Sequence, residues 1–186
     1  LTDALTGGGV GIVLGTNIYT PFTYNPAVSG AIASLNYAED AACTSGCFGD
    51  GQSTGPALLQ SGNLYILGSS SVITGPSTAW APKALSGLTA LDFGLVNVTA
   101  TTIFDNTQHP DFSASGAPIQ VGYFRANSTG PGGGGYSLAA GIDNWQITIV
   151  GGAAVVTPVP TLGTLEIALL ALAIGLLGLS FARRIR

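Results

Sequence analysis

The residues that could perform catalysis are few and scattered along this 186-residue chain, which has one histidine and two cysteines. His109 lies in the turn-like sequence Thr-Gln-His-Pro-Asp, with Asp105 and Asp111 nearby as possible partners in base catalysis. The chain has no Gly-x-Ser-x-Gly motif and no cysteine free to serve as a nucleophile. We therefore expect His109 to be a surface-loop residue.

Glycoside hydrolysis needs two carboxyl groups about 5–9 Å apart. Glu39 and Asp40 are the closest pair, but adjacent residues on a strand point to opposite faces of a sheet. The other acidic residues are isolated, so the sequence predicts a protein that is not an enzyme. A divergent glycan hydrolase stays open as an alternative.

Cys43 and Cys47 are separated by Thr-Ser-Gly. A disulfide closing this small loop would fit an oxidising compartment and a flexible Ser-Gly interior. A zinc site needs more ligands than two thiolates, and the single histidine is far along the chain.

Oxygen-bearing side chains in turns are the only candidates for a metal site, and the metal would be calcium. They are Asp105, Asp111 and Asp143, with Asn106 and Asn144 beside them. The same residue types cap turns without any metal, so we expect no required cofactor.

Exposed aromatic residues beside Asn or Asp could bind sugars. The candidates are Trp80, Tyr123, Tyr136 and Trp145. Tyr123 and Trp145 lie in alternating segments and are therefore predicted to belong to the core.

The composition excludes one class of partner. Residues 1–160 contain two basic residues against eight acidic ones, a formal charge of −6. Nucleic-acid binding requires a basic face, so it is excluded. Only 8% of all residues are charged, against about a quarter in ordinary soluble domains. Such low charge, together with 28 glycines, is typical of secreted β-rich proteins.

Short apolar stretches, broken by Gly, Pro, Asn and Ser, fill residues 1–150. Several of them alternate, as in Asn144-Trp-Gln-Ile-Thr-Ile, where residues 145, 147 and 149 share one face. This pattern predicts an all-β antiparallel sandwich, of the jelly-roll or lectin-like kind. The predicted strands are 10–14, 30–37, 63–67, 90–98, 119–126 and 145–150.

The C-terminal part has a different character. Residues 151–160 read as a linker, and residues 161–186 as a membrane-spanning helix with a basic end. In residues 162–182 only Glu166 is charged, and a helix of that length reaches roughly 30 Å, enough to cross a bilayer. The terminal arginines should stay in the cytoplasm, which places the body outside. We interpret the start at Leu1 as the result of signal-peptide removal.

The C-terminal part and the body each resemble a known family. Val159-Pro160-Thr161-Leu162, the apolar span, and then Arg183, Arg184 and Arg186 resemble the IPTL-CTERM variant of PEP-CTERM sorting signals. That family usually has Ile at the first position and often a Trp where Leu165 stands. The resemblance implies a Gram-negative envelope, an exosortase-type protease as partner and possible removal of the tail.

The body is similar to the laminin-G and concanavalin-A-like domains that precede such tails. Gly141-Ile-Asp-Asn-Trp-Gln-Ile-Thr-Ile is one of the segments that carry this similarity. The expected function is that of a non-catalytic surface or matrix component, with extracellular polysaccharide as its candidate ligand. The alternative is an accessory single-pass subunit packed against a larger membrane complex.

Overall fold

The computed structural model describes residues 2–5, 11–46, 52–68, 72–74, 78–97, 104–129 and 132–151. The chain divides into two compact units, Leu1–Ala154 and Val155–Arg186, and all described residues belong to the first. The predicted sorting motif, membrane span and arginine cluster lie outside the described residues. Among the helices that the structure describes, none is long and apolar enough to cross a membrane.

Four antiparallel strands form the first sheet, in the order β1-β11-β3-β7. They are β1 (Thr2–Leu5), β11 (Tyr136–Gly151), β3 (Ile32–Ser45) and β7 (Ala81–Leu88). β1 pairs with β11 from Tyr136 to Ala139. Among the described strands, the second half of β11 therefore pairs with β3 alone and forms a sheet edge.

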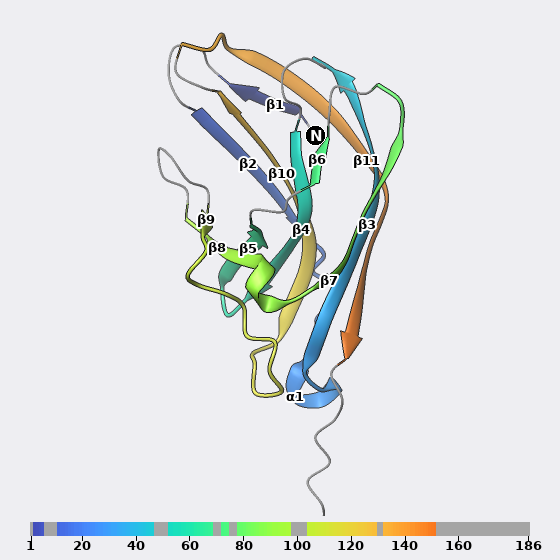
Figure 1. Ribbon diagram of the computed structural model, residues 1–186, viewed down its shortest axis with the longest axis vertical. Helices are drawn as coiled ribbons and strands as arrows, with labels where there is room; N and C mark the ends of the chain where they lie inside the picture. Colours follow the sequence, from blue (N-terminus) through green and yellow to red (C-terminus); the bar gives the residue numbers. More distant parts are fainter. Residues whose placement is uncertain are drawn as a thin grey trace, which may run out of the picture. The chain divides into compact units, whose positions relative to one another are not determined.

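Seven antiparallel strands form the second sheet, along the path β2-β10-β4-β5-β8-β9 with β6 joined to β4. They are β2 (Gly11–Ile18), β4 (Gln52–Gln60), β5 (Asn63–Leu67), β6 (Val72–Thr74), β8 (Phe93–Val96), β9 (Phe104–Asp105) and β10 (Ile119–Thr129). Figure 1 shows β3, β7 and β11 on one side and β2, β4 and β10 on the other. The predicted all-β, antiparallel architecture is confirmed.

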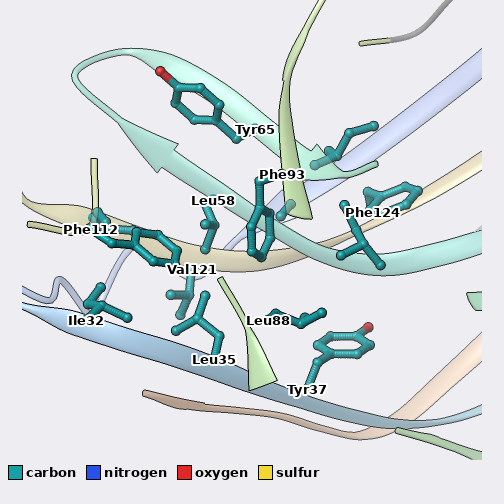
Figure 2. Packing of buried hydrophobic residues seen from close by; sticks show 14 of the residues in the cluster. Ile32, Leu35, Tyr37, Leu58, Tyr65, Leu88, Phe93, Phe112, Val121 and Phe124 are labelled. Atoms are coloured by element: carbon teal, nitrogen blue, oxygen red, sulfur yellow. The ribbon is translucent and has the colours of Figure 1, made fainter. Parts of the chain in front are cut away.

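The core lies between the two sheets. Along β3, Leu35, Tyr37 and Glu39 are buried, and the residues between them are more exposed. Such alternation is what a strand produces when one of its faces is covered. In Figure 2 the side chains of Ile32, Leu35 and Tyr37 rise from β3 towards Leu58 and Val121 of the second sheet.

Helical structure is confined to two short pieces among the described residues. The helix α1 (Pro26–Ser29) begins at Asn25, whose side chain accepts a hydrogen bond from the amide of Ala27. The 3₁₀ turn η1 (Ala90–Asp92) replaces the first part of the strand predicted at 90–98. The carboxylate of Asp92 accepts hydrogen bonds from the amide and hydroxyl of Thr89, at 2.7 and 2.9 Å, and so closes a local turn.

Prolines explain two strands that the sequence pattern did not predict. Pro56 lies in β4, between the residues that pair with β6 and those that pair with β5. A proline lacks the N–H that a pairing partner would need, and on the side of β5 and β6 no described residue pairs with Pro56. Pro82 lies in β7, the edge strand of the first sheet, where proline is also tolerated.

Candidate functional site

An apolar cleft of about 560 Å³ opens where the edge of β11 faces the segment that follows β2. We call it the aromatic cleft. It is lined by Tyr19, Phe22, Tyr24, Val121, Trp145, Gln146, Ile147 and Ile149. Clefts of this size with few polar groups are the usual form of small-molecule sites.

One wall of the cleft is the free edge of β11. The pairing of β11 with β3 is irregular between Asp143 and Gln146, and Asn144 has a φ of 50°. Asparagine tolerates this left-handed conformation better than most residues. Beyond the bulge, Trp145, Ile147 and Ile149 are half-buried and alternate with exposed residues, as the sequence predicted.

The opposite wall is the segment from Tyr19 to Tyr24, which backbone hydrogen bonds fix to β10. The amide of Tyr19 donates to the carbonyl of Val121 at 2.9 Å, and Tyr24 exchanges two bonds of 2.8 Å with Ile119. The hydroxyl of Tyr24 donates to the carbonyls of Ser29 and Gly30. This wall is therefore held in place before any ligand arrives.

Aromatic contacts join the two walls. The ring of Trp145 lies 6.3 Å from that of Tyr19 and 5.9 Å from that of Tyr123, in tilted arrangements. Tyr19 is 51% exposed and Phe22 is 42% exposed. Large aromatic side chains that remain this accessible beside a cleft are available for stacking on a ligand.

A second feature, the inter-sheet clamp, is a buried polar cluster of Tyr37, Glu39, Thr54 and Arg125. The Nη1 of Arg125 donates to the Glu39 carboxylate at 3.0 Å, and the hydroxyl of Thr54 donates to it at 3.0 and 3.2 Å. The hydroxyl of Tyr37 also donates to this carboxylate. Burial, reinforced by the charge of Glu39, raises the pKa of Tyr37 well above its ordinary value.

The clamp contacts the cluster of rings behind the cleft. The Arg125 guanidinium lies 5.5 Å from the centre of the Tyr123 ring, and Tyr123 in turn packs on Trp145. The Arg125 and Glu39 side chains are only 2% and 0% exposed. With the carboxylate enclosed and its oxygens occupied, the geometry suits a structural role.

The three calcium candidates each accept a hydrogen bond from a nearby backbone amide. Asp105 accepts hydrogen bonds from the hydroxyl and amide of Thr107, Asp111 accepts one from the amide of Ser113, and Asp143 accepts one from Asn144. The hydroxyl of Thr107 is the largest cause that lowers the pKa of Asp105. Within the described ranges no three potential metal-ligating side chains come together.

The other predicted residues are dispersed. The His109 ring lies 2.7 Å from the carbonyl of Phe93 through its Nδ1 and is half-buried. Cys43 is buried and disulfide-bonded, but Cys47 lies outside the described residues, so their pairing stays a prediction. Trp80 is 54% exposed and packs close to Gly141, away from the cleft-lining residues.

Sequence reasoning missed Tyr19, Phe22 and the Glu39–Arg125 pair. It did predict that Glu39 and Asp40 point to opposite faces, and only Glu39 enters the core. One signal was available for the ion pair: Arg125 is one of two basic residues before position 183 and lies within a strand-like apolar run. Tyr19 and Phe22 carried no such signal, because their segment does not alternate.

No family model matches the chain, and neither a curated protein nor a solved structure does so.

Proposed function

We propose that the domain formed by residues 1–150 is a non-catalytic glycan-binding module of lectin-like, jelly-roll type. The observation that carries the proposal is the aromatic cleft, in which Tyr19 and Phe22 are exposed and the half-buried Trp145 forms part of the lining. Sugar rings have apolar C–H faces that pack on aromatic rings, while their hydroxyls remain at the polar rim.

The surroundings of the cleft favour binding over hydrolysis. Glu39 is held in the inter-sheet clamp, and Asp105 and Asp111 are held in turns. The cleft itself is lined by uncharged side chains. Hydrolysis requires paired carboxyl groups at the bound sugar, whereas binding needs only stacking and hydrogen bonding.

The C-terminal tail supplies the location in this proposal. The VPTL motif, apolar span and arginine cluster support export to a Gram-negative envelope and recognition by an exosortase-type protease. The domain would then be displayed on the cell surface or in the matrix, where its ligand is an extracellular polysaccharide. An intact mass of the native protein decides whether the tail is kept as an anchor or removed.

Affinity electrophoresis of the full chain through gels containing neutral polysaccharides tests the proposed function. Trp145→Ala and Tyr19→Ala should each weaken retardation at least about tenfold, the usual loss for an aromatic residue central to an interface. Trp80→Ala is the control, because Trp80 is as exposed as Tyr19 but is not among the cleft-lining residues. Retardation that depends on Trp80 and not on Trp145 or Tyr19 would refute the assignment of the cleft.

A further inference from the structure

The chemistry of the lining restricts which sugars suit the aromatic cleft. Val121, Ile147 and Ile149 contribute aliphatic surface in addition to the four aromatic lining residues. The hydroxyl of Tyr24 is already committed to the carbonyls of Ser29 and Gly30. The Tyr19 hydroxyl and the Gln146 amide are then the polar side-chain groups at the cleft surface that could bind the hydroxyls of a sugar ring.

An unsubstituted hexose is a poor match for such a lining, because each hydroxyl that loses water without gaining a partner opposes binding. A sugar in which an acetyl ester replaces a hydroxyl is a better match. Its methyl group can pack on the aliphatic surface of Ile147 and Ile149. The ester removes a hydroxyl donor and presents a carbonyl acceptor.

A donor that suits such an acceptor lies behind the cleft surface, on the lining residue Trp145. The Nε1 atom of Trp145 is buried and has no hydrogen-bond partner among the described residues. An indole N–H can only donate. Because this atom lies beneath the surface, the half-buried indole must turn for its N–H to face a ligand.

The charge of the domain favours a neutral acceptor group on the glycan over a carboxylate. The lining carries no basic side chain that could pair with a carboxylate, and residues 1–160 have a formal charge of −6. A polyanionic glycan would be repelled by the domain as a whole. A neutral carbonyl avoids this repulsion.

We infer that the aromatic cleft selects neutral polysaccharides bearing O-acetyl groups, with the ester methyl against Ile147 and Ile149 and the ester carbonyl accepting from Trp145 Nε1. The inference rests on the proposed function and specifies the ligand class of the same site.

A matched pair of polymers tests this inference. One sample of O-acetylated glucomannan, which is neutral, is divided, and half is deacetylated with mild alkali. The full chain should bind the acetylated half about tenfold more tightly, the value of one good hydrogen bond with a buried methyl. Trp145→Phe keeps a ring but removes the N–H, and should reduce this preference severalfold while still binding both polymers.

Fluorescence gives an independent readout. In Trp80→Phe, Trp145 is the only tryptophan left, because the chain has two. Its emission should shift with the acetylated polymer and respond more weakly to the deacetylated one.

Equal affinity for the two polymers, lost in Tyr19→Ala, would overturn the acetyl preference and leave the proposed function intact. Failure to bind either polymer would overturn both. Binding to phosphatidylcholine vesicles that depends on Trp145 and is not displaced by the acetylated polymer would assign the cleft to lipid instead.

Discussion

Arg125 of β10 and Glu39 of β3 form an ion pair of 3.0 Å that links the two sheets, with both side chains enclosed in the core. Thr54 and Tyr37 supply further hydrogen bonds to the same carboxylate. A buried charge without its partner is strongly unfavourable, so the two residues depend on each other. The remaining Nη2 atom of Arg125 has no partner among the described residues.

The first prediction concerns this ion pair. Glu39→Gln should lower the free energy of unfolding by about 3–5 kcal/mol, because the Arg125 guanidinium stays buried without its counter-charge. Arg125→Met should lower the free energy of unfolding by a similar amount, because the Glu39 carboxylate then stays buried without its counter-charge. Urea denaturation of the full chain measures both.

The double variant Glu39→Leu, Arg125→Met is the control, since it removes both buried charges. It should be more stable than either single variant. Single variants that each lose less than about 1 kcal/mol would show that the clamp contributes little.

The second prediction follows from Tyr37, whose pKa is raised by burial and by Glu39. Its phenol stays protonated in the folded chain, whereas an unfolded tyrosine ionises near pH 10. Stability from this residue is therefore complete below about pH 10 and declines as the pH rises further. Urea denaturation between pH 7 and pH 11 measures the decline.

Tyr37→Phe is the comparison variant for the alkaline range. It should be less stable at pH 7 by about 1.5–3 kcal/mol, the value of a hydrogen bond to a charged group, and should lose less stability above pH 10. Parallel pH profiles for the two proteins would argue against a buried, protonated Tyr37.

The third prediction concerns the contact between β2 and β10. A Cβ at Gly122 would lie 2.0 Å from the backbone oxygen of Asn17, so even a methyl group forces the strands apart. Gly122→Ala should cost about 3 kcal/mol of stability. Gly134→Ala provides the control, because a Cβ there meets nothing within 4 Å. Equal Tm values for the two variants in thermal unfolding would contradict the close approach of β2 and β10 at Gly122.

The fourth prediction concerns Asp105, a half-buried residue whose carboxylate pKa is lowered by hydrogen bonds from Thr107. Thr107→Val removes the hydroxyl donor and keeps the amide donor. The pKa of Asp105 should then rise towards its ordinary value, which an NMR titration of the side chain would measure. Ser113→Ala leaves Asp105 untouched and serves as control; an unchanged pKa in Thr107→Val would contradict the cap.

The fifth prediction concerns the two cysteines. Cys43 is disulfide-bonded, and Cys47 is the only other cysteine in the chain. Both should resist alkylation until a reductant is added, and digestion should yield one cross-linked peptide from a single chain. Labelling of either thiol in the untreated native protein would argue against a disulfide between Cys43 and Cys47.

The fold class was predictable because its signals are local. Alternation along 145–150 predicted a strand and its more buried face, since successive side chains on a strand point to opposite sides. Alternation along 119–126 predicted the strand, but residues on both of its faces are buried. Turn-capping by Asp105 and Asp111 was predictable for the same reason: an Asx side chain reaches backbone only two residues away. β4 and β7 escaped prediction because Pro56 and Pro82 are acceptable only where a neighbouring strand does not need their N–H.

The cleft and the clamp depend on pairing between distant segments, and the tertiary structure alone decided them. Glu39 and Arg125 are 86 positions apart in the chain. Tyr19 meets Trp145 only because β2, which precedes Tyr19, pairs with β10 while β11 enters the other sheet. The sequence by itself determined that alternating segments such as 145–150 form strands with one face more covered than the other. Which buried residues meet, and where an edge stays open, followed from sheet order and register, which no local pattern encodes.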